Sequence, residues 1–183
     1  MSARARTSLQ TRIDIEPAAD SKEPMISIRP IGGADEESRC AGMMAATDPW
    51  VTLGRGYDQC LAAIGNRERE VYVAADGAAI RGLIILSMTG ALVGYIQTIC
   101  VDPDWRRGGL GTEILDWAEA RIFRRWPNVF LCVSSFNDGA HALYQRRGYE
   151  LVGELRDYLI AGYSELLMRK TIGSIDSFTP QQR

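Results

Sequence analysis

Histidine is almost absent from this sequence, since the chain of 183 residues contains only His141. The four cysteines, at positions 40, 60, 100 and 132, form no C-x-x-C pair. Zinc sites are usually built from closely spaced cysteine and histidine ligands, so we expect no metal. Cysteines without a disulfide pattern fit a reducing compartment, and we therefore expect a cytoplasmic protein.

The sequence also lacks a basic excess and a long apolar run. Its net charge of −2 leaves no surplus of lysine and arginine for a phosphate backbone, so we expect no nucleic-acid partner. The longest apolar run, Leu83 to Leu86, is strand-sized, whereas a membrane-spanning helix needs about 20 apolar residues. The first residues contain no apolar core of a signal peptide, and no membrane partner is expected.

The length and the hydrophobic content of 46% predict one folded domain. Polar residues at both ends set its bounds. We expect a flexible N-terminal arm over residues 1–24, the folded domain over residues 25–173, and a polar C-terminal tail over residues 174–183.

Apolar periodicity predicts a mixed α/β chain in which helices flank a sheet. Four helices are expected, over residues 35–46, 57–64, 112–125 and 138–147. Seven strands are expected, over residues 25–30, 70–75, 80–88, 91–101, 129–134, 149–155 and 165–171. The last two strands should pair in antiparallel fashion.

The most informative stretch runs from Tyr95 to Thr112. An apolar strand ends at Val101, Asp102-Pro103 stops it, and a glycine-rich turn leads into a helix. The first N–H groups of a helix have no partner within it, its dipole attracts anions, and glycine allows close approach. Arg106 and Arg107 add cations that suit phosphate oxygens. The stretch predicts a phosphate site, and a plain turn that merely needs glycines is the alternative.

This turn fits neither common nucleotide-binding motif. A P-loop requires Gly-Lys-Ser/Thr, and Gly111 rather than lysine precedes Thr112; a dinucleotide fingerprint requires a glycine where Ile114 stands. The pattern that remains is Arg106-x-x-Gly109-x-Gly111. It resembles the Arg/Gln-x-x-Gly-x-Gly/Ala loop of the GCN5-related N-acetyltransferases (GNAT), which takes the pyrophosphate of acetyl-CoA.

A second stretch, residues 129–149, strengthens the resemblance. It contains a strand, Asn137, a helix with the family's Ala-x-x-Leu-Tyr pattern ending at Tyr144, and Gly148-Tyr149 before another strand. The resemblance covers roughly residues 70–170, and its motifs are nearest to the branch of ribosomal-protein alanine and protein N-terminal acetyltransferases. It implies a central, twisted, mixed and mostly antiparallel sheet of about seven strands, splayed in the middle and flanked by about four helices.

The resemblance implies an acetyl-CoA-dependent N-acetyltransferase in which a primary amine attacks the thioester directly in a ternary complex. Acetyl-CoA would be a co-substrate, with no metal. The strand before the loop would bulge and splay, so that its backbone binds the pantetheine arm and stabilises the oxyanion. The residues that the motifs assign to cofactor binding are Ile99, Cys100, Val101, Arg106, Arg107, Gly108, Gly109, Leu110, Gly111, Thr112, Asn137 and Tyr144.

Tyr144 is the expected catalytic residue. A neutral phenol with a pKa near 10 can protonate the departing CoA thiolate, which is the role of the matching tyrosine in the family. The alternative is an aromatic side chain that fills the helix–sheet interface. Asn137 can likewise act as a helix N-cap, alone or while binding the cofactor. Covalent catalysis by Cys100 or Cys132 is not expected, because free cysteines in core strands behave as small apolar residues.

The general base is where the sequence departs from the family. Cys132 stands where the ribosomal-protein alanine acetyltransferases carry a glutamate that accepts the proton, and Tyr95 lies near the acidic position of histone-type members. Glu70, Glu68 and Glu165 are the acids that could assist a route through water. The lack of a strong base favours an amine of low pKa, since an α-amino group near 8 needs less help than lysine near 10.4.

The acceptor stays open between a peptide or protein N-terminus and a small amine. Trp50 either lines the acceptor site or fills the core between two helices. Tyr158 and Tyr163 loosely match tyrosines that border the peptide entrance in N-terminal acetyltransferases, but Leu159 replaces the second tyrosine of their usual pair. The rival function is a non-catalytic acyl-CoA-binding sensor, which would keep the glycine-rich loop without needing the catalytic tyrosine. A homodimer is compatible with this fold.

Overall fold

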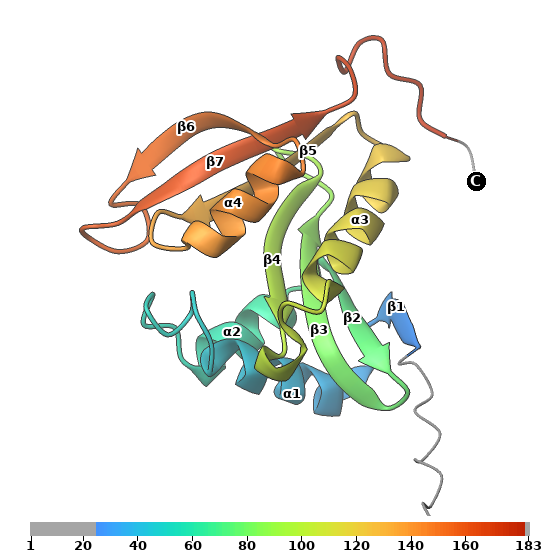
Figure 1. The fold of residues 1–183 in the computed structure, drawn as a ribbon. Helices are drawn as coiled ribbons and strands as arrows, with labels where there is room; N and C mark the ends of the chain where they lie inside the picture. The colour runs from blue at the N-terminus through green and yellow to red at the C-terminus, as the bar shows by residue number, and fades with distance from the viewer. Residues whose placement is uncertain (1–24, 182–183) are drawn as a thin grey trace, which may run out of the picture.

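The computed structural model describes residues 25–181, which form one seven-stranded sheet with helices on both faces (Figure 1). The strands are β1 Ile26–Pro30, β2 Glu70–Asp76, β3 Ala79–Ser87, β4 Tyr95–Val101, β5 Asn128–Ser134, β6 Glu150–Arg156 and β7 Ser164–Thr171. The helices are α1 Gly33–Ala45, α2 Tyr57–Ile64, α3 Leu110–Phe123 and α4 Asp138–Arg146, with a short 3-10 helix, η1 Pro103–Trp105. The strand order is β1-β2-β3-β4-β5-β7-β6, antiparallel throughout except for β4 and β5. The predicted fold class is confirmed.

Three element boundaries differ from the prediction. β4 begins at Tyr95 rather than at residue 91, because Gly90 and Gly94 adopt φ of +91° and +80° and bend the chain before it. α3 begins at Leu110 rather than at Thr112, and β6 begins one residue later than expected. The η1 turn was not predicted. The expected N-terminal arm, residues 1–24, lies outside the described residues.

One face of the sheet packs against α3 and α4. α3 buries Leu110, Ile114, Ala118 and Ile122, which recur every fourth residue and therefore form one continuous stripe. This stripe contacts alternate residues of the strands, among them Ile84 and Leu86 of β3 and Val129 and Leu131 of β5. Each such side chain contributes about 1.5–3 kcal/mol by its burial.

The other face packs against α1 and α2. Cys40 and Met44 of α1 and Cys60 of α2 lie against Val73 of β2 and its neighbours in β3. Trp50, in the loop between the two helices, is only 8% exposed and belongs to this core. The interpretation of Trp50 as an acceptor-site wall is therefore wrong, and the alternative, a tryptophan that fills the core, holds.

The sheet divides into two parts between β4 and β5. Only two residue pairs, Tyr95 with Phe130 and Ile96 with Leu131, join these parallel strands. The register of β4 against β3 shifts at the same level, which leaves Gln97 as a bulge. Strand β4 then continues to Val101 paired with β3 alone, so the predicted bulge and splay are both present.

A buried charged network fixes α4 and β7 against α3. Glu119 of α3 is 6% exposed and accepts a hydrogen bond from Lys170 Nζ at 2.5 Å. Arg147, at the end of α4, pairs with Asp116 and lies 3.9 Å from Glu119. Breaking a buried pair leaves an uncompensated charge, which costs about 3–5 kcal/mol, so these contacts hold α4 at one height above the sheet.

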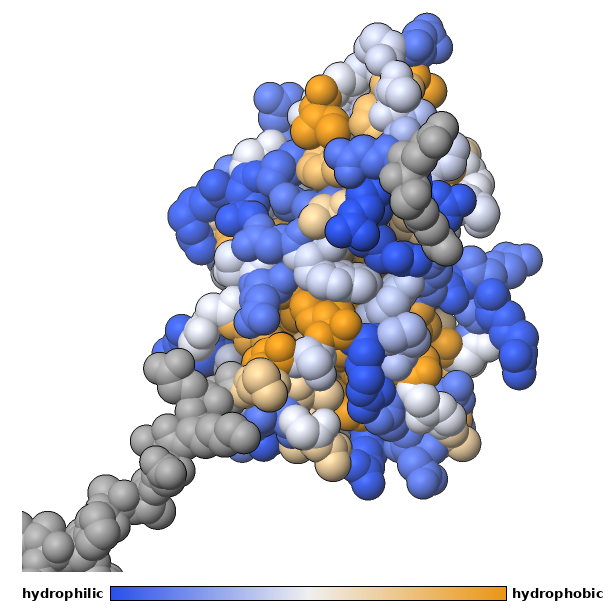
Figure 2. Space-filling view, turned by 90° about the vertical axis from the view of Figure 1, so that its right-hand side faces the viewer, coloured by the Kyte–Doolittle hydropathy of each residue, from blue (hydrophilic) through white to orange (hydrophobic). Residues whose placement is uncertain are grey.

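The surface is mixed in polarity. On the face shown in Figure 2, hydrophilic residues surround separate apolar patches. Within residues 25–181, none of the helices has the length and apolar character needed to cross a membrane. The same described part of the chain contains no group of three histidine, cysteine or acidic residues placed to hold a metal ion.

Candidate active site

The open edge of β4 forms the first part of the site. Asp102 N–H donates to the carbonyl of Arg81 at 2.9 Å, which fixes the alternation of hydrogen bonds along the strand. Cys100 shares the direction of Asp102 and turns its backbone toward β3. Ile99 and Val101 turn their N–H and C=O groups the other way, toward the side from which β5 has splayed. An extended ligand can hydrogen-bond there as an added strand.

The glycine-rich loop lies at the end of this edge. Gly109 is the N-cap of α3 with φ of +92°, and its carbonyl accepts from Thr112 N–H at 2.9 Å. The N–H groups of Leu110 and Gly111 precede the first helical hydrogen bond and are available to a ligand. No atom lies within 4 Å of the position of a Cβ on Gly109, so there is open space outside the loop. These features fit a phosphate group.

The two arginines of the loop differ in conformation. Arg106 folds back, and its Nε–H donates to the carbonyl of Val101 at 3.1 Å, which places the guanidinium over the end of β4. Arg107 adopts a left-handed φ of +65°, which is uncommon for a residue with a side chain. The loop therefore presents two cations beside the free N–H groups of the helix.

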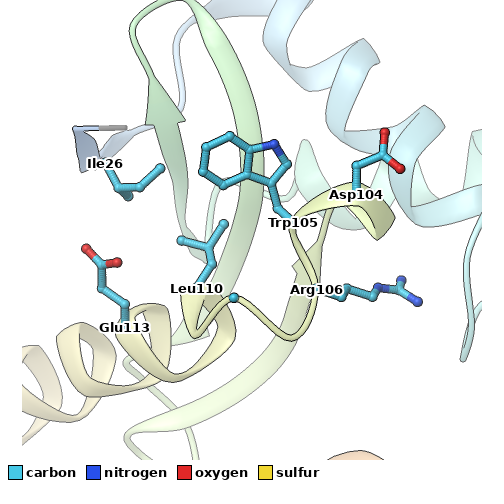
Figure 3. Close-up of a pocket in the computed structure, with 7 residues that line it drawn as sticks. Ile26, Asp104, Trp105, Arg106, Leu110 and Glu113 are labelled. Atoms are coloured by element: carbon cyan, nitrogen blue, oxygen red, sulfur yellow. The ribbon is translucent and has the colours of Figure 1, made fainter. Parts of the chain in front are cut away.

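A pocket of about 400 Å³ lies on the outer side of the loop, toward β1 (Figure 3). Trp105 and Leu110 point toward Ile26 there, whereas Arg106 points away from them. The loop residue Gly108 also lines this pocket. It lies beyond the loop from the open edge of β4 and is distinct from the splay between β4 and β5.

Helix α4 supplies the two remaining predicted residues. Asn137 is its N-cap, and its side-chain oxygen accepts from Ala140 N–H at 3.2 Å, so the capping role is real. Tyr144 is half-buried against the α3 face of the sheet, with its ring centroid 5.6 Å from that of Tyr149. Burial raises the pKa of Tyr144 to about 12, so this phenol is neutral at pH 7.

A second group of polar side chains lies on the opposite face of β4, β5 and β7. Glu165 of β7 pairs in register with Ser134 of β5, and Ser134 Oγ donates to Glu165 Oε1 at 2.5 Å. Cys132 lies two residues before Ser134 and therefore on the same face. Burial is the main cause that raises the pKa of both Glu165 and Cys132. The Tyr95 hydroxyl faces Cys132, and burial together with this contact raises its pKa.

The other acids considered as helpers lie elsewhere. Glu70 Oε2 pairs with Arg121 at 2.7 Å on the α3 side, and this arginine helps to hold the pKa of Glu70 low despite its partial burial. Glu68 is exposed in the turn before β2. Neither lies on the face of Cys132, so the hypothesis that they assist the base is wrong.

Two loops border this second face, the α1–α2 loop and the β6–β7 loop, both at the left of Figure 1. Tyr158, on the β6–β7 loop, is 64% exposed. Tyr163 packs edge-on against Phe136, with ring centroids 5.0 Å apart. Arg55, on the α1–α2 loop, is close enough for its charge to lower the pKa of Glu165 in part. The rim of this region is therefore aromatic, with one cation.

Sequence reasoning missed the pairing of Ser134 with Glu165 and the bulge at Gln97. Both depend on which residues face each other across neighbouring strands. A register of this kind follows from tertiary packing and leaves no local motif.

Comparison with known proteins agrees with the site. The sequence model described as "Acetyltransferase (GNAT) family" matches residues 35–149. The N-alpha-acetyltransferase RimI of Mycobacterium tuberculosis (strain ATCC 25618 / H37Rv) is 31% identical over 157 residues, which cover 81% of this chain and 94% of that protein.

Solved structures share the fold at low identity. The ribosomal-protein-S18-alanine N-acetyltransferase from Escherichia coli superposes with a TM-score of 0.64 at 18% identity, covering 85% of this chain and 99% of that one. An aminoglycoside 6'-N-acetyltransferase complexed with coenzyme A gives a TM-score of 0.65 at 17% identity, covering 82% of this chain and 98% of that one.

Proposed function

Because the chain belongs to the acetyltransferase (GNAT) family, we propose that it transfers the acetyl group of acetyl-CoA to a primary amine by direct attack in a ternary complex. The coarse class, an N-acetyltransferase, follows from family membership. The observation that carries the proposal is the alignment of an open strand edge with a glycine-rich helix N-terminus. Together they form one continuous surface for an extended thioester that ends in a pyrophosphate.

Each part of that surface has a separate task. The N–H groups of Leu110 and Gly111, with Arg106 and Arg107, would bind the pyrophosphate. The outward backbone groups of Ile99 and Val101 would bind the pantetheine amides and hold the thioester in place. A backbone N–H of β4 would stabilise the charge that develops on the thioester oxygen.

Tyr144 would act as the general acid. The amine attacks the thioester carbon, the C–S bond breaks, and the phenol donates its proton to the sulfur. Burial keeps Tyr144 protonated across the physiological range, which this role requires. The network around Glu119 and Arg147 would keep α4, and with it the phenol, at a constant height.

The acceptor class is proposed to be a peptide or protein N-terminus, with a small primary amine as the second candidate. The similarity to RimI, named as an N-alpha-acetyltransferase, supports the first. The aromatic residues of the β6–β7 loop also suit a peptide, because Tyr158 is exposed where a chain could lie. The aminoglycoside acetyltransferase with the same fold supports the second.

The test measures CoA release from acetyl-CoA with a panel of short peptides and small amines, for the wild type, Gly109→Asp and Gly77→Asp. Gly109 and Gly77 both have positive φ, +92° and +59°, and open space where a Cβ would stand, so the two aspartates carry the same kind of backbone strain. We expect Gly109→Asp to lose acetyl-CoA binding by calorimetry and to lose turnover, because a carboxylate would stand where the pyrophosphate binds.

Gly77→Asp, in the β2–β3 turn, should retain both. Unchanged acetyl-CoA affinity of Gly109→Asp would refute the cofactor site. Tight binding without turnover of any acceptor would instead favour a non-catalytic acyl-CoA sensor.

A further inference from the structure

We propose that Glu165 is the proton acceptor of this enzyme, binding the ammonium group of the acceptor and taking its proton before attack. The inference rests on the proposed function and supplies the group that the sequence does not offer at the usual place. A thiol, Cys132, stands where related enzymes place a glutamate, while a carboxylate stands on the adjacent strand of the same face.

The sheet register brings Glu165 to this position. In β5 and β7, Ser134 lies directly opposite Glu165, and Cys132 lies directly opposite Leu167. Side chains of directly paired residues share a face, so Ser134, Cys132 and Glu165 all project from the face opposite α3 and α4. The carboxylate is thus one strand across and two positions along from Cys132, still beside the splay.

The surroundings of the carboxylate suit a base. Glu165 is 6% exposed and is held in one orientation by Ser134 Oγ at 2.5 Å. The titratable groups that face it are Cys132 of β5, Tyr95 of β4, Tyr158 of the β6–β7 loop and Arg55 of the α1–α2 loop. Arg55 is the one cation among them, and it lies on an exposed loop. The second carboxylate oxygen has no hydrogen bond among the described residues, which leaves it for a ligand.

Other groups in this region are poorer bases. Burial raises the pKa of Cys132, so its thiol stays protonated at neutral pH and has no strong acceptor site. Burial also keeps Tyr95 protonated by raising its pKa. The same cause raises the pKa of Glu165 above its ordinary value, which brings a carboxyl closer to the range in which a general base works best.

The proton balance is complete with the two residues already named. The ammonium gives one proton to Glu165 and becomes a neutral amine. As the neutral amine attacks and the C–S bond breaks, the nitrogen releases a second proton to solvent and Tyr144 protonates the thiolate. The products are the N-acetyl amine and CoA thiol, and both Glu165 and Tyr144 return to their starting states by exchange with solvent.

The experiment compares Glu165→Gln with Glu154→Gln as a matched control. Glu154, on neighbouring β6, also accepts a short hydrogen bond from a serine, Ser164 Oγ at 2.6 Å, but it is exposed. We would measure kcat/KM against pH with the best acceptor of the panel. We would also measure the binding of that amine to the protein–CoA complex by calorimetry.

For Glu165→Gln we expect a loss of about 100-fold in kcat/KM at pH 7, the usual range for a general base. The deficit should shrink about tenfold per pH unit until the pH reaches the pKa of the amine, about 8 for an α-amino group, because the amine then loses its proton to solvent. Amine binding at pH 7 should weaken at least fivefold. CoA affinity, the melting temperature and Glu154→Gln should remain at wild-type values.

Several results would overturn the inference. One is a Glu165→Gln enzyme with more than a third of wild-type kcat/KM at pH 7. Another is a deficit that is equal at all pH values, since that indicates a structural role. If the wild type turns over no amine, the proposed function fails; amine binding that is insensitive to Glu165→Gln would then reject Glu165 separately.

Discussion

Replacing Tyr144 with phenylalanine removes one oxygen and leaves the ring packed beside Tyr149 and the α3 face of the sheet. The loss should therefore fall on turnover rather than on folding. Burial raises the pKa of Tyr144 to about 12, whereas a thiol has a pKa of about 8.5. The phenol is thus a weak acid for this task, and the proton transfer becomes favourable only as the C–S bond breaks. We expect kcat to fall about tenfold to a hundredfold, the low end for acid–base catalysis, or about 1.4–2.7 kcal/mol.

The assay follows CoA thiol release under saturating acetyl-CoA, with CoA affinity measured in parallel. The control is Tyr149→Phe, which deletes the same atom from the neighbouring ring but on the side of Glu119, away from the loop. Turnover of Tyr149→Phe should stay within about twofold of the wild type. Equal turnover by Tyr144→Phe and the wild type would refute the general-acid role, and equal losses in both variants would indicate that the position of α4 matters rather than the proton. Because the pKa is about 12, wild-type kcat should show no decline near pH 10 from ionisation of this phenol.

Two further predictions concern stability. Gly94→Ala should destabilise the fold by at least 2 kcal/mol in urea unfolding, on the order expected for strain and overpacking, because its Cβ would lie 2.6 Å from the Asn128 carbonyl oxygen; Gly90→Ala, with similar φ but open space, should cost less, and equal losses would contradict the clash. Stability should also fall as pH rises from 9 toward 11, because burial raises the pKa of Cys40 to about 12 and of Cys100 to about 11, so these thiols ionise first in the unfolded chain. That contribution is fully present below pH 9, and Cys40→Ala should flatten the decline between pH 9 and 11; an unchanged slope would reject the assignment.

The sequence predicted every helix and every strand because their apolar periodicity is strong and glycine or proline separates them. The four-residue spacing from Leu110 to Ile122 and the alternation in β2 and β5 are local signals, visible without a structure. The glycine-rich loop was equally legible, since its function depends on residue types at fixed spacing. Boundaries failed where backbone geometry decides them, as at Gly94 and Gly109.

The acceptor half was less predictable for a physical reason. Glu165 was one of three acids that the sequence could offer, and only the pairing of β5 with β7 distinguishes it from Glu70 and Glu68. Trp50 looked suitable for a ligand wall because it follows a proline, yet packing between α1 and α2 buries it. Both outcomes depend on contacts between residues far apart in the chain, which local patterns do not encode.

The two residue pairs between β4 and β5 have a consequence for the cooperativity of the molecule. A sheet usually spreads mechanical and thermal load across a full ladder of hydrogen bonds, but here its two halves share only the first rungs, with α3 spanning the gap from one side. A thioester lying along Ile99 and Val101 adds rungs to that ladder. The substrate then serves as a temporary structural member, and each round of product release returns the two halves to weaker coupling. Affinity for acetyl-CoA and the rigidity of the whole sheet are therefore two readings of the same set of backbone groups.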